Sequence, residues 1–198
     1  MRVRTLMVAD PITVSVKTPV DQTIAIMRDH SIRHLPVVDA GNRLVGWATM
    51  SDLRQGLIPS MVANLNLADI MVRTPYTIGP DDDVEDAAQL IYLKKIGGLP
   101  VVEKDGTLVG VLTVTDLLRA FIEMMGLLTQ SWRLDIDLAG HEDGFREVTR
   151  IIQENGGRVL SVAMASHRTD KEIVYVRLAG GDLADVRDAL CGAGYEVQ

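Results

Sequence analysis

A unit of 64 residues is written twice, in register and without a gap, over the first 128 residues of the chain. The segment LPVVDAGNRLVG at 35–46 aligns with LPVVEKDGTLVG at 99–110. Seven positions recur within and around this segment: Met7, Pro11, Pro36, Gly46, Thr49, Asp52 and Leu53 return as Met71, Pro75, Pro100, Gly110, Thr113, Asp116 and Leu117. A repeat of this length indicates a supersecondary unit that cannot cover its own apolar face and packs against its copy. A site in one copy is therefore expected to have a pseudo-symmetric counterpart in the other.

Composition narrows the class of protein. An apolar content of 47% with 24% charged residues is typical of a soluble globular chain, and 198 residues suffice for one to three domains. The net charge of −7 argues against nucleic acid as a partner, because phosphate backbones select basic surfaces. The single cysteine, Cys191, excludes an internal disulfide and fits a reducing compartment. The start of the chain lacks the apolar stretch of a signal peptide, and the apolar segment 117–128 is too short to span a bilayer. We therefore expect a cytoplasmic protein that contacts neither nucleic acid nor membrane.

Each repeat is predicted to run strand, helix, strand, strand, helix. In the first copy, 11–14 is extended, Thr18 caps a helix with Pro19 at its first position, and Asp82 replaces Thr18 in the second copy. The predicted hairpin strands are 35–39 and 43–49, followed by a helix from about Leu53. A linker helix is predicted from Asp116 to about Leu128. Its apolar side needs a partner, which predicts a homodimer; the residues are Leu118, Phe121, Ile122 and Met125.

The composition changes near residue 130. The remaining segment is predicted to form strands at 132–138, 159–167, 172–180 and 195–198, with helices at 143–155 and 183–194. This is the βαββαβ, or ferredoxin-like, order. The predicted fold class is therefore mixed α+β and α/β, with two repeats at 1–64 and 65–128 and a separate domain at 131–198.

A hydroxyl and a carboxylate recur where each hairpin ends. Thr49 is followed three residues later by Asp52, and Thr113 by Asp116. A carboxylate has two acceptor oxygens, which suit the two vicinal hydroxyls of a ribose. The threonine hydroxyl and helix N-terminal amides suit phosphate oxygens. The alternative is that the carboxylates only cap the following helices; retention of the whole pattern in both copies favours binding.

The repeated segments L-P-V-V and L-V-G-h-h-T-x-x-D-L, where h is apolar, resemble a tandem pair of CBS domains, the Bateman module, over residues 1 to about 125. The resemblance implies a pseudo-twofold disc that binds AMP, ADP, ATP or S-adenosylmethionine in clefts between the repeats, and that senses rather than catalyses. The chain is also similar to the small bacterial CBS proteins of the acetoin-utilisation type.

The resemblance implies a set of site residues. The ribose aspartates of the family correspond to Asp52 and Asp116, and its hydroxyls three residues earlier correspond to Thr49 and Thr113. Its adenine-pocket positions correspond to Trp47 and Val111. First-strand contacts to the base would come from Met7, Pro11, Ile12, Met71, Pro75 and Tyr76, and phosphate contacts from Ile32, Arg33, His34 and their counterparts Ile96, Gly97 and Gly98. Only the first copy has a basic pair here, since Lys94 and Lys95 lie one step too early. We therefore expect unequal clefts, and the sequence leaves open which of them receives Arg33.

The C-terminal segment resembles an ACT domain. Its loop 139–148 is similar to the strand-to-helix turn of that family, where a glycine, here Gly144, opens the first helix. Asp143 stands where the family has proline. The resemblance implies an amino-acid ligand at Asp143 and Gly144; association between copies of the chain is the alternative.

Other signals favour structural roles. His30 and His34 have a spacing that could hold a metal, but no third ligand is near. Asp81, Asp82 and Asp83 open a predicted helix, where its dipole favours negative charge. Cys191 is expected to be a core thiol. We therefore predict a regulatory protein without metal or catalytic cofactor, which senses an adenine nucleotide and relays occupancy to its ACT-like domain or to an unknown partner. A structural homodimer without nucleotide is the alternative, and an enzyme would need a catalytic set that the motifs do not supply.

Overall fold

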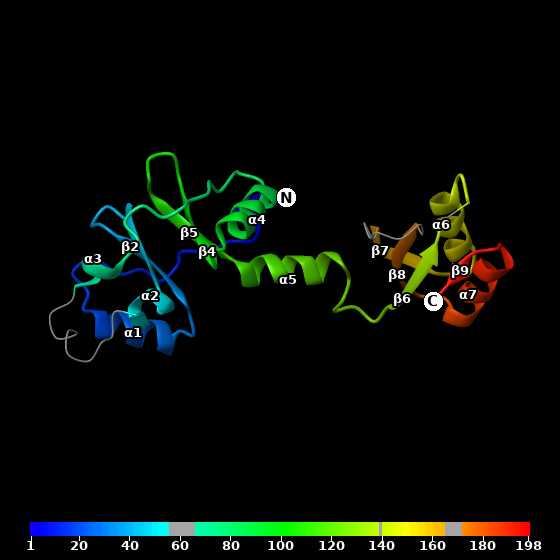
Figure 1. Ribbon diagram of the computed structural model, residues 1–198, viewed down its shortest axis with the longest axis horizontal. Coiled ribbons are helices and arrows are strands. Elements are labelled where there is room, and N and C mark those ends of the chain that lie inside the picture. Colours follow the sequence, from blue (N-terminus) through cyan, green and yellow to red (C-terminus); the bar gives the residue numbers. More distant parts are fainter. Residues whose placement is uncertain (56–65, 139, 165–171) are drawn as a thin grey trace. The chain divides into compact units, whose positions relative to one another are not determined.

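The chain folds into two units, Met1–Leu118 and Arg119–Gln198. The computed structural model describes residues 1–55, 66–138, 140–164 and 172–198 (Figure 1). The predicted boundary between residues 64 and 65 and the predicted strand residues 165–167 lie outside the described residues. No helix in these described ranges is long and apolar enough to cross a membrane.

The first unit contains the two repeats. Its elements are the 3-10 helix η1 (Val3–Thr5), β1 (Val8–Ala9), α1 (Val20–Asp29), β2 (His34–Val38), β3 (Leu44–Thr49), α2 (Met50–Gln55), α3 (Leu67–Ile70), α4 (Val84–Lys94), β4 (Gly98–Val102), β5 (Leu108–Thr113) and the start of α5 (Val114–Met124). The predicted hairpins are confirmed, and their registers match: His34 faces Thr49 in one copy and Gly98 faces Thr113 in the other. Both hairpins shift register at the same place, after Val37 and after Val101. The repeat in sequence is therefore a repeat in structure.

Each L-P-V-V strand buries a row of apolar side chains two residues apart. Leu35 and Val37 are fully buried, as are Leu99 and Val101 in the second copy. In the first copy this strand packs into a core with Met27, Leu53 and Leu67.

The tips of the two hairpins bind each other. Asn42 and Gly106, at equivalent positions, both have positive φ, 59° and 86°, which asparagine and glycine tolerate best. Leu44 N donates to Gly106 O (3.1 Å) and Leu108 N donates to Asn42 O (3.0 Å). The copies are thus joined through backbone as well as side chains.

The segment before the first helix of each copy crosses to the hairpin of the other copy. Val8 of β1 pairs with Val111 of β5, and Val72 exchanges backbone hydrogen bonds of 2.8 and 2.9 Å with Trp47. The predicted acidic run, residues 81–83, forms ion pairs with the start of the chain, a role that the helix-dipole argument did not predict. Arg4 forms an ion pair with Asp81 (2.6 Å), and Arg2 forms one with Asp83 (3.1 Å).

Several predicted helix boundaries are wrong by a few residues. The Thr18 hydroxyl accepts from Ser15 N (3.2 Å) and Asp82 Oδ2 accepts from Gly79 N (2.7 Å), so both side chains close the preceding turns instead of capping. Helices α1 and α4 follow Pro19 and Asp83 instead. Helix α2 begins at Met50, not Leu53, and α5 runs from Val114 to Met124, not from Asp116 to Leu128. Gly126, with φ of 67°, lies just beyond the end of α5.

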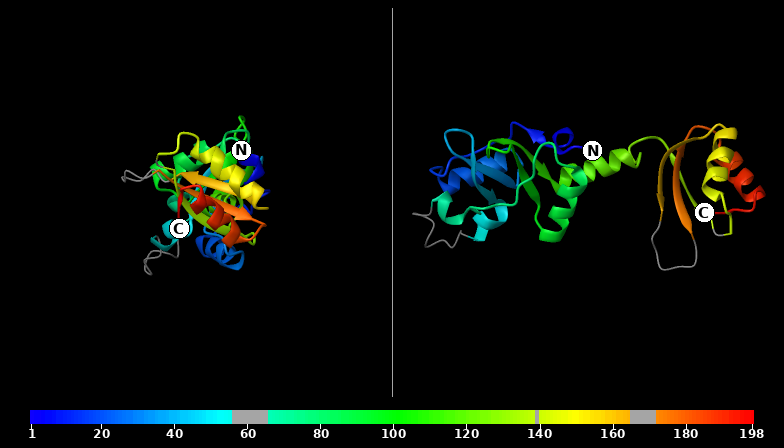
Figure 2. Two further views of the ribbon diagram at one scale, coloured as in Figure 1. Left: turned by 90° about the vertical axis from the view of Figure 1, so that its right-hand side faces the viewer. Right: turned by 90° about the horizontal axis from the view of Figure 1, so that it is seen from above.

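The second unit is a four-stranded antiparallel sheet in the order β7-β8-β6-β9. Its elements are β6 (Trp132–Asp137), α6 (Gly144–Glu154), β7 (Arg158–Met164), β8 (Ile173–Ala179), α7 (Leu183–Gly192) and β9 (Glu196–Val197). Both helices cover one face of the sheet (Figure 2). The core between them joins strand residues such as Ile136 and Leu178 to helix residues such as Ile152 and Leu190. The element order is the predicted one, and the resemblance to ACT domains stays a prediction. Cys191 is exposed, so the expectation of a core thiol is wrong; its neighbour Leu190 enters the core instead.

Candidate functional site

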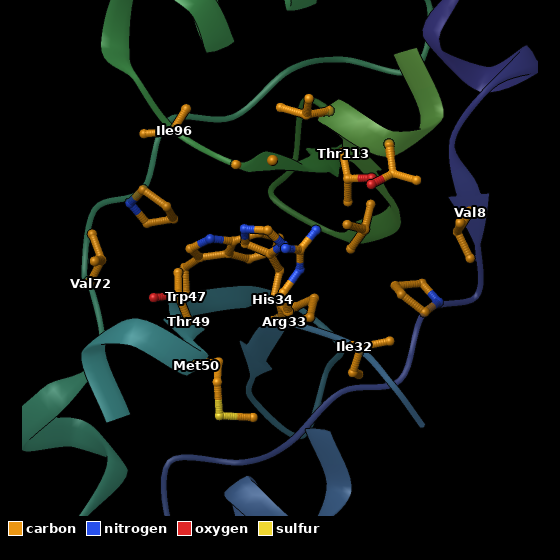
Figure 3. Close-up of a pocket in the computed structure, with 18 of the residues that line it drawn as sticks. Val8, Ile32, Arg33, His34, Trp47, Thr49, Met50, Val72, Ile96 and Thr113 are labelled. Carbon is orange, nitrogen blue, oxygen red and sulfur yellow. The ribbon is translucent and has the colours of Figure 1, made fainter. Parts of the chain in front are cut away.

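A cavity of about 970 Å³ lies in the first unit and is lined by both copies (Figure 3). Its volume is near the upper end of the range of about 300–1,000 Å³ for small-molecule sites. All the residues predicted for the nucleotide site line it except Met7 and Met71; these are Pro11, Ile12, Ile32, Arg33, His34, Trp47, Thr49, Asp52, Pro75, Tyr76, Ile96, Gly97, Gly98, Val111, Thr113 and Asp116. The structure therefore brings together residues that are up to about a hundred positions apart in the chain.

The two predicted methionines pack elsewhere. The sulfur of Met71 lies over Gly46, and that of Met7 lies over Gly110, where a Cβ would come within 2.6 Å of Sδ. Because each methionine fills the space left by a glycine in the other copy's hairpin, neither reaches the cavity. These recurring residues hold the crossing segments in place.

In each copy, the threonine and the aspartate of the T-x-x-D motif form hydrogen bonds with each other. The Thr49 hydroxyl and amide donate to Asp52 Oδ2 (2.6 and 3.3 Å), and Asp52 N donates back to Thr49 Oγ1 (3.2 Å). Thr113 and Asp116 repeat the arrangement at 2.7, 3.0 and 3.4 Å. This is a reciprocal capping box, which explains why α2 and α5 start immediately after the threonine. The capping alternative is thus correct for one carboxylate oxygen of each aspartate, while both residues also line the cavity.

His34 and Trp47 form a stacked pair at the centre of the cavity (Figure 3), with ring centroids 5.7 Å apart. His34 also reaches the second copy, where a Cβ on Gly97 would lie 2.5 Å from His34 Nε2. Burial and the nearby Arg33 lower the pKa of His34, and Asp52 opposes them more weakly. The imidazole is therefore neutral near pH 7.

Arg33 and Lys95 bring permanent positive charge to the cavity. Both copies share this one cavity, so Arg33 lines the same space as both carboxylates. The expectation that Lys95 lies too early is wrong: it ends α4 in the left-handed conformation (φ 54°) and lines the cavity. Lys94 instead places its ammonium 5.0 Å from the ring centroid of Tyr76.

Sequence reasoning missed a further group of lining residues. They are Val8, Asp10, Ser31, Pro36, Met50, Ser51, Val72, Thr74, Lys95, Val114 and Thr115. Several lie next to predicted residues on the crossing segments or inside the T-x-x-D motif. Position relative to the repeated motifs is the signal that could have found them.

Other candidates lie outside the cavity. Gly144 begins α6 as predicted, and Asp143 precedes it without a side-chain cap. Nearby, the Tyr195 hydroxyl donates to Glu147 Oε2 (2.8 Å), and burial together with Glu147 raises the pKa of Tyr195 to about 12. Over the described ranges, no three His, Cys, Asp or Glu side chains are grouped to hold a metal ion.

Two curated relatives resemble this chain over only part of their own length. It is 31% identical over 118 residues to homoserine O-acetyltransferase of Methanohalobium evestigatum, covering 60% of this chain and 24% of that protein. It is 34% identical over 116 residues to inosine-5′-monophosphate dehydrogenase of Korarchaeum cryptofilum, covering 59% of this chain and 23% of that protein. The chain thus matches about a quarter of each enzyme.

Solved structures match the first unit. The CBS domain pair of protein MJ0100 in complex with 5′-methylthioadenosine and S-adenosyl-L-methionine has a TM-score of 0.57 and 30% identity, over 61% of this chain and 95% of that chain. CBSX2 in complex with AMP, a protein of Arabidopsis thaliana, has a TM-score of 0.56 and 30% identity, over 62% and 96%. A protein of Vibrio cholerae assigned to acetoin utilization (AcuB) has a TM-score of 0.57 and 28% identity, over 65% and 95%.

The family model of the CBS domain matches residues 3–58 and 67–123. These two ranges make up more than half of the chain and include both T-x-x-D motifs. These ranges also contain both hairpins and the crossing segments that build the cavity. The chain belongs to the CBS domain family, with two CBS domains in tandem.

Proposed function

We propose that the CBS pair binds an adenosine-containing ligand and acts as a regulatory sensor, not as an enzyme. The observation that carries the proposal is the cavity that is lined by both T-x-x-D aspartates, Asp52 and Asp116, and by Trp47. A cavity of about 970 Å³ is large enough for a nucleoside with a 5′ substituent. The complexes of MJ0100 and CBSX2 support the class of ligand.

The proposed ribose contact uses Oδ1 of the Asp52 carboxylate. Oδ2 of Asp52 accepts hydrogen bonds from Thr49, whereas no donor among the described residues hydrogen-bonds to Oδ1. A carboxylate oxygen accepts two hydrogen bonds readily, so Oδ1 suits vicinal hydroxyls. The proposed base contact is with the apolar and aromatic wall that includes Trp47 and Tyr76.

The effect of ligand binding would be transmitted through the contacts that join the two copies. Each half of the cavity combines the hairpin of one copy with the crossing segment of the other, so a ligand between them contacts both copies. A ligand shifts such an arrangement only by the difference between its affinities for two states, and typical couplings are about 1–3 kcal/mol. We propose the C-terminal unit, as an ACT-like domain, or a separate partner as the recipient, in a cytoplasmic homodimer.

A structural role is the second candidate, and one observation favours it. Helix α5 exposes the large apolar side chains of Leu118, Phe121 and Met124. Such a stripe would serve association between copies even if the cavity stayed empty.

A thermal-shift series separates the two candidates. A ligand that binds the folded state raises the melting temperature by mass action. We expect stabilisation by at least one of AMP, ADP, ATP, adenosine, 5′-methylthioadenosine and S-adenosylmethionine. Failure of every adenosine compound at millimolar concentration would leave the structural role.

A further inference from the structure

The cavity has little positive charge to offer a phosphate chain. Among the described residues that line it, the carboxylates of Asp10, Asp52 and Asp116 outnumber the permanent cations, Arg33 and Lys95. Anionic ligands are held chiefly by clustered cations, by helix N-termini or by hydroxyl and amide donors. Each of these sources can be followed in the structure.

The hydroxyl of the leading threonine in each T-x-x-D motif already has an acceptor. Both threonine hydroxyls, Thr49 and Thr113, donate to the carboxylate three residues later at 2.6 and 2.7 Å. To bind a phosphate oxygen, each hydroxyl would have to give up its hydrogen bond to a charged carboxylate. These two threonine hydroxyls therefore favour the present capping box over a phosphate.

The helix N-termini are also neutralised. Met50 N donates to Arg33 O (3.0 Å), and Val114 N donates to Gly97 O (3.1 Å), so the first amides of α2 and α5 have partners. The aspartate at the third position of each helix places a negative charge at the positive end of the helix dipole. A second anion at the same place would meet that carboxylate.

His34 adds no charge near neutral pH, because burial and Arg33 lower its pKa. The remaining walls are largely apolar, as Figure 3 shows for Ile32, Met50 and Ile96. Such walls suit an uncharged or thioether substituent better than a polyphosphate, whose desolvation would be costly there.

We propose that the cavity selects adenosine derivatives whose 5′ end is uncharged, cationic or carries a single phosphate, and discriminates against adenosine di- and triphosphates. This selectivity rests on the proposed function, since it concerns the same site. Arg33 and Lys95 are sufficient for one phosphate, and each additional phosphate adds charge that the three carboxylates repel.

Titration calorimetry of the full chain with adenosine, AMP, ADP and ATP, without divalent cations and at fixed ionic strength, tests the proposal. We expect ATP to bind at least about tenfold more weakly than AMP, with the gap narrowing at high salt because ions screen exposed charges. ATP binding as tightly as AMP would overturn the selectivity and leave the proposed function intact. Absence of binding by all four compounds, with S-adenosylmethionine also inert, would overturn both.

Asp10→Asn is the variant that isolates charge. Asp10 lines the cavity in the left-handed conformation (φ 47°), which asparagine also adopts, so the backbone is preserved. We expect the ratio of ATP to AMP dissociation constants to fall by about threefold or more, since one repelling charge is removed. Glu103→Gln removes the same charge from an exposed site outside the cavity and should leave the ratio unchanged. Equal ratios in wild type, Asp10→Asn and Glu103→Gln would show that the lining charge does not select the ligand.

Discussion

Asp52→Asn separates the two roles of the T-x-x-D carboxylate. In the structure, Oδ2 accepts from the Thr49 hydroxyl and amide, at 2.6 and 3.3 Å. Asparagine keeps one carbonyl oxygen, which can occupy this position, so the capping box survives. Its amide group then replaces Oδ1, so an acceptor becomes a donor and the charge is lost. Asp52→Ala removes both roles.

The two variants should therefore differ in stability but not in binding. Loss of a cap costs about 0.5–2 kcal/mol, so we expect the free energy of unfolding of Asp52→Ala to fall by about 1 kcal/mol and that of Asp52→Asn to change by a few tenths. A hydrogen bond to a charged group contributes about 1.5–3 kcal/mol, and each 1.4 kcal/mol is tenfold in affinity. Both variants should thus bind AMP about 10- to 100-fold more weakly than wild type.

Urea unfolding measures the stability of each variant, and titration calorimetry with AMP measures its affinity. Glu103→Gln, which loses a carboxylate outside the cavity, is the control for charge alone. If Asp52→Asn binds AMP like wild type, the carboxylate is only a cap and the ribose assignment is wrong. If Asp52→Asn is as unstable as Asp52→Ala, the amide does not keep the local hydrogen bonds, and the separation fails.

Three further outcomes follow from the structure. Gly97→Ala places a Cβ 2.5 Å from His34 Nε2, so the ring must move, and we expect a loss of about 1–3 kcal/mol in urea unfolding; the loss should shrink in a His34→Ala background, and an equal loss there would refute the contact. The pKa of His34 is lowered in the fold, so as pH falls through about 6.5 the unfolded chain takes up the proton first and stability drops; His34→Gln should flatten this part of the pH profile, and an unchanged slope would contradict it. The pKa of Tyr195 is raised to about 12, so wild-type stability should decline as pH rises from about 10, where the unfolded side chain ionises, towards 12; Tyr195→Phe should not show this decline, and a parallel decline would exclude Tyr195 as its source.

The local parts of the fold could be predicted because their signals are local. The L-P-V-V strands and their turns carry apolar runs and turn residues side by side, and the hairpins follow from them. The exchange of segments between copies could not, because it depends on pairing over long sequence distances, such as Val8 with Val111. Met7 and Met71, which were predicted to contact the base, lie outside the cavity lining for this reason: their recurrence reflects packing on glycines of the opposite copy.

The helix starts show a second limit. Thr49 and Thr113 were assigned to phosphate because hydroxyls at a strand exit suit anions, but a hydroxyl followed three residues later by a carboxylate also satisfies the capping box. The two uses share the same atoms, so sequence spacing alone does not distinguish them. Lys95 was missed because its place in the cavity depends on one left-handed backbone conformation at the end of α4.

One difference between the copies is explained by their contact. The first copy has Arg33 and His34 where the second has Gly97 and Gly98. His34 of the first copy extends into the space that a side chain at position 97 would need, since even a Cβ there would lie 2.5 Å from its ring. A side chain at position 97 would therefore compete with the His34 ring, which stacks on Trp47. The first copy thus supplies Arg33, His34 and Trp47 to the shared cavity, and the second copy has a glycine at position 97, where His34 needs the space. The wall that a ligand meets is therefore asymmetric although the backbone is repeated.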